Sequence, residues 1–206
     1  MTFPDEKFTD AASYADAYFE QLARAAASVD RGRLAAAVAL LEKAYERRAT
    51  LFVCGNGGSA SISNHLACDH GKLVATDTNL LPKIQSLAAN IEVITAIAND
   101  IDYAEVFTHQ LRLNGEKGDI LMTISSSGDS ENVVRAIQWA RDNGCESIAL
   151  TGFNGGRTGK LATVNLHVAG DNYGVIEDVH QSLMHLMGQY MRQKRMSLDL
   201  IQQRKF

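Results

Sequence analysis

Blocks of apolar and polar positions alternate along most of the chain. Five short runs are rich in β-branched and other apolar residues, which is typical of strands, and stretches with helical spacing separate them. The pattern predicts strands at 49–54, 84–89, 119–124, 147–151 and 164–169. It predicts the intervening helices at about 59–71, 91–99, 103–114, 130–143 and 156–162.

Both ends of the chain are predicted to be helical. Residues 7–48 are rich in alanine and have helical spacing, and a break near Asp30 and Gly32 divides them into two helices. A long helix is predicted from about 175 to 203. Its apolar stripe at helical spacing consists of Ile176, Val179, Leu183, Leu186 and Tyr190.

Strands that alternate with helices imply right-handed βαβ units and a parallel sheet. The near-continuous apolar run ILMTI at 120–124 fits a sheet that is covered on both faces. The chain has 206 residues and two prolines, and no linker or internal repeat suggests a domain boundary. We therefore expect a single α/β domain over 1–206.

Composition and charge narrow the class of protein. The three cysteines, Cys54, Cys68 and Cys145, lack CxxC spacing and fit a reducing compartment better than a disulfide framework. The acidic start MTFPDEKFTD does not resemble a signal peptide, and no apolar run approaches the roughly 20 residues of a membrane span. We expect a cytoplasmic protein. The net charge of −4 does not favour a nucleic-acid partner.

Two serine- and glycine-rich turns follow predicted strands. The first is GNGGS at 55–59, and the second is SSSGDS at 125–130. Glycines let the backbone approach an anion, and the N-terminus of the next helix offers unpaired N–H groups. The Walker pattern and the dinucleotide spacing GxGxxG are both absent, so a small phosphorylated ligand is favoured over a nucleotide. The alternative is that these runs are ordinary turns and helix caps.

A second group of chemically active side chains has helical spacing. Ser61, His65 and Asp69 share one helical face, and Ile62 and Leu66 beside them can pack inward. The last helix repeats the spacing with Glu177, Gln181 and His185. Two carboxylates and two histidines can converge on a small ligand or on zinc. Alternatively, these side chains are surface pairs and solvated residues. We interpret His70, His109 and His167 as structural or exposed, and His180 as packed or supporting the site.

Taken together, the motifs resemble the SIS (sugar isomerase) family, and within it the phosphoheptose isomerases. The resemblance runs from about residue 10 to 195 and rests on CGNGGSA, HLACD, AIAND, GDILMTISSSGDSENV, ALTGFNGG and EDVHQSLMH. It implies a doubly wound five-stranded parallel sheet of flavodoxin-like type, with N-terminal helices and a long C-terminal helix. It also implies a homotetramer with active sites between subunits, in which the helical extension 1–48 supports assembly.

The resemblance also implies roles for individual residues. The phosphate of a small sugar would be bound by Gly57, Gly58, Ser59, Ser125, Ser126, Ser127 and Ser130. Asn56 would line the sugar site, and Asn99 and Asp100 form the AND motif that contacts substrate. Asp69 would be the catalytic base and His185 the acid. Some members bind zinc, and here its ligands would be His65, Asp69, Glu177 and His185.

Two residues depart from the family pattern. The family usually has Glu where this chain has Asp69, and Gln where it has Glu177, which we also place in the substrate site. A shorter base would sit back by about one C–C bond, and catalysis is sensitive to such displacements. The implied reaction is aldose–ketose isomerisation of sedoheptulose 7-phosphate through an enediol, assisted by zinc. The alternatives are another phosphosugar, or a non-catalytic tetrameric adaptor.

Overall fold

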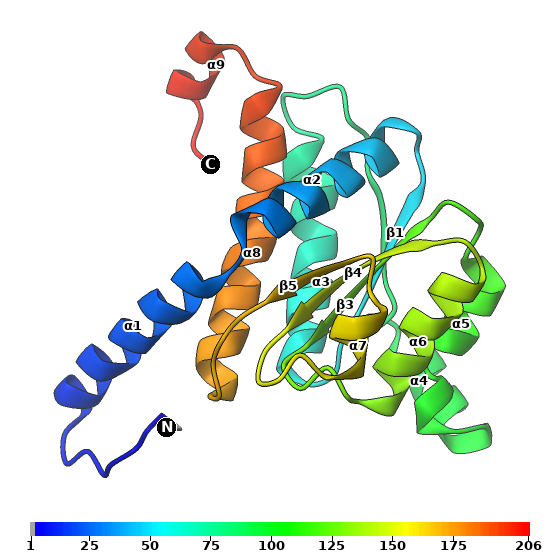
Figure 1. Cartoon of the computed structure of the whole chain (residues 1–206). Helices are drawn as coiled ribbons and strands as arrows, with labels where there is room; N and C mark the ends of the chain where they lie inside the picture. Colours follow the sequence, from blue (N-terminus) through cyan, green and yellow to red (C-terminus); the bar gives the residue numbers. More distant parts are fainter. Residues whose placement is uncertain (1–2) are drawn as a thin grey trace.

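The computed structural model describes residues 3–206, and a five-stranded parallel sheet lies at its centre (Figure 1). The strand order is β2-β1-β3-β4-β5, the order of flavodoxin-like doubly wound sheets. The predicted fold class is thereby confirmed. The strands are β1 (Thr50–Cys54), β2 (Lys83–Ser86), β3 (Ile120–Ser125), β4 (Glu146–Thr151) and β5 (Val164–His167).

Successive side chains of each strand enter two separate cores, because neighbouring residues of a strand point to opposite faces. Leu51 and Val53 belong to one core, whereas Phe52 and Cys54 belong to the other. The first core is covered by α1 (Ala11–Ser28), α2 (Arg31–Glu46), α3 (Gly58–Asp69) and α8 (Tyr173–Lys194). The second is covered by α4 (Ile91–Asp100), α5 (Thr108–Asn114), α6 (Glu131–Asp142) and α7 (Gly156–Leu161).

Most predicted elements are present with small shifts at their ends, and three predictions need correction. The predicted helix 103–114 is a 3₁₀ turn, η2 (Tyr103–Glu105), followed by α5. The predicted helix 59–71 continues into a π-helical segment, η1 (His70–Val74). The predicted helix 175–203 ends at Lys194, because Ser197 caps a separate helix, α9 (Leu198–Gln203), by accepting a hydrogen bond from the Leu200 amide.

The N-terminal helices lie against the last long helix, and α1 extends beyond the sheet (Figure 1). The break between α1 and α2 is confirmed, since Asp30 caps α2 through the Arg33 amide. The Tyr18 hydroxyl of α1 donates to Asp178 Oδ2 of α8 at 2.6 Å. In residues 3–206, no helix is long and apolar enough to cross a membrane.

Two buried histidines hold elements together as neutral side chains. His70 accepts from the Tyr45 hydroxyl at 2.9 Å and donates to the Met184 carbonyl at 3.0 Å, so it joins α2, η1 and α8. His180 of α8 donates to the Thr151 carbonyl at the end of β4. Burial lowers the pKa of each imidazole from 6.5 to about 4. The structural interpretation of His70 is therefore supported.

These histidines predict a loss of stability in mild acid. The unfolded chain protonates both at a pKa near 6.5, whereas the folded chain does so only near 4. Stability is therefore full above pH 6.5 and falls as the pH drops toward 4, by roughly 2–3 kcal/mol for each histidine. Urea unfolding at pH 7 and at pH 4.5, at one protein concentration, measures this change. His70→Gln should be less stable at pH 7 but should lose less on acidification, and an unchanged loss would contradict the assignment.

Candidate active site

The two serine-rich loops meet where the sheet changes winding direction. β1 and β3 are neighbours, and the helices that follow them, α3 and α6, cover opposite faces. In doubly wound sheets, this switch point leaves a crevice at the carboxyl ends of the strands, where ligands bind. Loop 55–59 leaves β1 here, and loop 125–130 leaves β3. The structure thus brings together the two motifs that the sequence predicts to bind phosphate.

The first loop is tied across the crevice by amide side chains. Asn56 exchanges two hydrogen bonds of 2.9 Å with Asn132 of α6, and the Tyr103 hydroxyl donates to Asn56 Oδ1 at 3.0 Å. Gly57 has a φ of +55°, a conformation that few other residues adopt. Ser59 is buried in the first turn of α3. Three hydrogen bonds therefore fix the side chain of Asn56, and the sugar contact that the family resemblance implies for it stays a prediction.

In the second loop, the serine hydroxyls have different partners. Ser125 Oγ accepts from the Gly128 amide at 3.1 Å, and Ser127 Oγ accepts from the Asp129 amide at 3.3 Å. Each of these hydroxyls keeps its own proton free to donate to an anion. Ser126 Oγ is buried and has no hydrogen-bond partner within residues 3–206. Ser130 precedes α6, and its side chain makes no capping bond. The hydroxyls of Ser125 and Ser127 therefore stay free to donate to a ligand.

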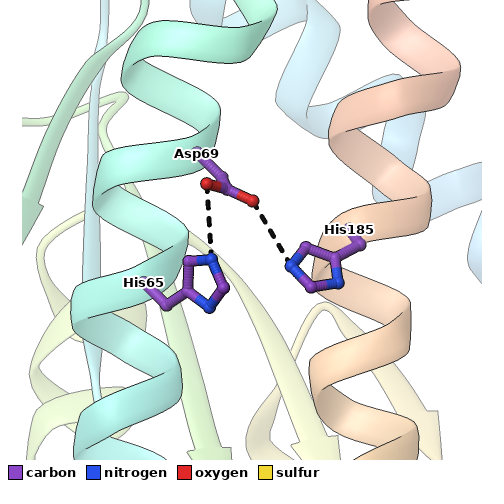
Figure 2. Close-up of side chains that lie close together, drawn as sticks. All are labelled: His65, Asp69 and His185. Atoms are coloured by element: carbon purple, nitrogen blue, oxygen red, sulfur yellow. Dashed lines mark ion pairs between the residues drawn. The ribbon is translucent and has the colours of Figure 1, made fainter. Parts of the chain in front are cut away.

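The second group of side chains lies along the seam between α3 and α8 (Figure 2). Asp69 and His65 project from α3, and His185 projects from α8 toward them. His65 Nε2 lies 3.4 Å from Asp69 Oδ1, and His185 Nε2 lies 3.3 Å from Asp69 Oδ2. The two imidazole rings meet edge to face, with centroids 4.9 Å apart. The helical spacing that groups these residues in the sequence therefore produces a cluster in space.

Gln181 also belongs to this cluster, and sequence reasoning did not place it in the site. Its amide nitrogen lies 2.8 Å from His65 Nδ1 and 3.2 Å from His185 Nε2. Its only signal in the sequence is its helical spacing on α8, midway between Glu177 and His185. Asn132 was missed as well, although a polar residue before the apolar pair Val133 and Val134 is a clue to a contact across the crevice.

Glu177 stands apart from the three-residue cluster of His65, Asp69 and His185. Its carboxylate packs directly on Gly58, where a Cβ atom would lie 2.3 Å from Glu177 Oε2. Burial, and next the charge of Asp178, raise the pKa of the Glu177 carboxyl. Asn99 and Asp100 are exposed at the end of α4 and bond to each other. The roles predicted for Glu177, Asn99 and Asp100 stay predictions.

The cluster fits a zinc ion in both donor chemistry and spacing. Imidazole nitrogens and carboxylate oxygens are common zinc ligands. One ligand atom from each of His65, Asp69 and His185 lies within 4.8 Å of the others. Donors bound to one zinc at about 2.0–2.1 Å in a tetrahedron lie roughly 3.3 Å apart, close to the His–Asp separations of 3.3 and 3.4 Å. These residues would hold the ion.

The side of α8 that carries His185 borders an open hollow of about 660 Å³. His185, Leu186 and Gln189 line it from α8, and Ile201 and Phe206 line it from the C-terminal segment. Asp77 holds this segment by ion pairs with Arg192 at 2.8 Å and Arg204 at 3.1 Å. A ligand at His185 would therefore meet open space bounded by an apolar wall.

Comparisons with known proteins define the class of this fold and site. The protein-family model that describes the SIS domain matches residues 13–152 of this chain. The chain belongs to the SIS-domain family.

Similar proteins within this family include phosphoheptose isomerases. The enzyme of Desulfovibrio desulfuricans is 38% identical over 143 residues, which cover 69% of this chain and 68% of the relative. That of Synechocystis is 37% identical over 154 residues, covering 75% of this chain and 79% of the relative. The structure of phosphoheptose isomerase from Neisseria gonorrhoeae superposes with a TM-score of 0.81 at 29% identity, covering 89% of this chain and 100% of that one. The resemblance seen in the sequence motifs is confirmed.

Gly128 should be more sensitive to substitution than another glycine of similar backbone conformation. Gly128 and Gly144 have φ values of +66° and +73°, so alanine at either costs about 1–2 kcal/mol. At Gly128, the added Cβ would also lie 2.4 Å from the Gly155 carbonyl oxygen, whereas at Gly144 it meets only the flexible Lys117 side chain. Urea unfolding should show a clearly larger loss for Gly128→Ala. Equal losses would show that loop 125–130 is not tightly packed.

Proposed function

We propose that the protein is an aldose–ketose isomerase that converts sedoheptulose 7-phosphate to D-glycero-D-manno-heptose 7-phosphate. The observation that carries the proposal is the Asp69–His185 pair, with its atoms 3.3 Å apart, in a fold whose switch point holds two hydroxyl-rich loops. The names of the relatives support the choice of substrate. The loops would bind the phosphate, and Asn56 would contact the sugar.

The reaction needs a base and a group that moves protons between oxygens. Asp69 would take a proton from the carbon beside the carbonyl and return it to the neighbouring carbon after an enediol forms. His185 would serve the carbonyl oxygen. Acid–base help of this kind is worth roughly 10²–10⁴-fold for each group. The phosphate contacts are remote from the reacting carbons, so their binding energy can position the sugar.

A zinc ion held by His65, Asp69 and His185 would polarise the substrate carbonyl as a Lewis acid. Asp69 would then have two competing tasks, because a carboxylate that holds a cation is a weaker base. Glu177 is the alternative base, since its raised pKa makes it a better proton acceptor. Glu177→Gln separates the two cases: turnover persists if Asp69 is the base and collapses if Glu177 is.

The proposal includes assembly into a homotetramer with active sites between subunits. In the single chain, the side chains of His65 and His185 are 46% and 38% exposed, which is open for a site that should exclude water. Leu186 and Tyr190 are predicted to be part of the packed stripe of the last helix, but each is 46% exposed. They line an apolar groove of about 400 Å³ between α2 and α8. A second copy would cover both features.

Turnover is tested by NMR, following sedoheptulose 7-phosphate with the purified protein in the presence of zinc or of a chelator. Wild-type protein should produce heptose 7-phosphate signals. Asp69→Asn and His185→Gln should each reduce the rate by about 10²–10⁴-fold. Asp142→Asn on α6 and His109→Gln on α5 are matched controls and should stay active. No conversion by folded wild-type protein in either condition would favour another phosphosugar or an adaptor role.

Assembly is tested by light scattering after size-exclusion chromatography. Leu186→Lys places a charge in the apolar groove and should shift the tetramer to smaller species. Leu113→Lys, at an exposed position of α5 outside the groove, is the control and should remain tetrameric. A monomeric wild-type protein with full activity would refute the shared site.

A further inference from the structure

One side chain contacts both histidines of the cluster. Gln181 lies on α8 one turn before His185, and its amide nitrogen is 2.8 Å from His65 Nδ1 and 3.2 Å from His185 Nε2. The amide is partly buried between α3 and α8. A side chain in this position can determine which ring nitrogen of each histidine carries a proton, because its nitrogen only donates and its oxygen only accepts.

The contact with His65 fixes the tautomer of that ring. Because the Gln181 nitrogen donates, His65 Nδ1 must accept and therefore carries no proton. A neutral His65 then carries its proton on Nε2, which faces Asp69 Oδ1 at 3.4 Å. The amide has a second N–H, which can donate to His185 Nε2. In the chain without a cation, the contact with Gln181 thus leaves the proton of a neutral His65 on Nε2, the nitrogen that faces Asp69.

A cation reverses the requirement at His65. An imidazole binds a metal through a bare nitrogen, and its other nitrogen then carries the proton and donates it to an acceptor. With Nε2 directed at the cation beside Asp69, Nδ1–H would face Gln181. The same amide, turned over about its last torsion, presents its oxygen at that place.

We propose that Gln181 is a positioning residue that selects the tautomer of His65 and supports cation binding by offering either its N–H groups or its oxygen. The inference rests on the proposed function, because His65 and His185 are the cation ligands and the acid of that reaction. Glu177 cannot orient His65 in this way, because its carboxylate packs against Gly58.

Two substitutions test the donor and the acceptor of the Gln181 amide separately. Gln181→Leu has a similar size and offers neither donor nor acceptor. Gln181→Glu keeps the acceptor and removes the donor. Gln193→Leu, three turns further along α8, is the matched control for adding an apolar side chain to the same helix.

The first measurement is an NMR spectrum of the histidine ring nitrogens in metal-free, ¹⁵N-labelled protein. Wild type and Gln193→Leu should show His65 protonated on Nε2. Gln181→Leu should show a mixture of tautomers, and Gln181→Glu should show His65 protonated on Nδ1. A wild-type His65 protonated on Nδ1, or a pattern that Gln181→Leu leaves unchanged, would overturn the proposal.

The second measurement is calorimetric titration with zinc alone. Gln181→Leu should weaken zinc binding by about 10–100-fold, as removal of the outer partner of a metal-binding histidine typically does, whereas Gln181→Glu should not weaken it. Equal affinity of wild type and Gln181→Leu would refute the supporting role. Neither measurement uses a sugar. If both succeed while sedoheptulose 7-phosphate is not converted, the proposed reaction fails and the role of Gln181 stands.

Discussion

The side-by-side packing of α3 and α8 on one face of the sheet is the contact on which the site depends. Leu66 of α3 and Met184 and Met187 of α8 are completely buried there, and burial of each such side chain contributes about 1.5–3 kcal/mol. Gly188 has no side chain to keep α8 away from η1, since a Cβ would lie 3.1 Å from the His70 ring. The apolar side of this seam sets the distance at which the polar side holds Asp69 and His185.

The second constraint is the direction in which the sheet is wound. Because α3 and α6 leave neighbouring strands toward opposite faces, the loops after β1 and β3 open onto one crevice. The Asn56–Asn132 pair ties the two sides together. The loops that we propose to bind phosphate are therefore attached to the ends of the strands, while the proposed acid–base groups project from helices. The proposed isomerase reaction needs both, since the loops would position the sugar and the helical side chains would move the protons.

Local spacing predicts what depends on a single element. Ile62 and Leu66 are buried as their spacing predicts, and His65 and Asp69 share a face. Residue spacing does not predict burial or side-chain contacts where these depend on a neighbouring helix or strand. Leu186 and Tyr190 continue the apolar stripe of α8, yet they lie beside a groove that no part of residues 3–206 fills. Gln181 and Glu177 share a face of α8 with His185, but only the opposing helix decides that Gln181 meets the histidines and that Glu177 meets Gly58.

The central claim is that exchangeable side chains carry the proton between two carbons of the sugar. The most direct test is to run the reaction of sedoheptulose 7-phosphate in D₂O and to locate deuterium in the product by NMR. Asp69 is partly exposed, so its proton can exchange with solvent during turnover. The account predicts deuterium at C2 of the heptose 7-phosphate. A product that retains only the hydrogen of the substrate through many turnovers would contradict it, since it would indicate direct hydrogen transfer between the carbons.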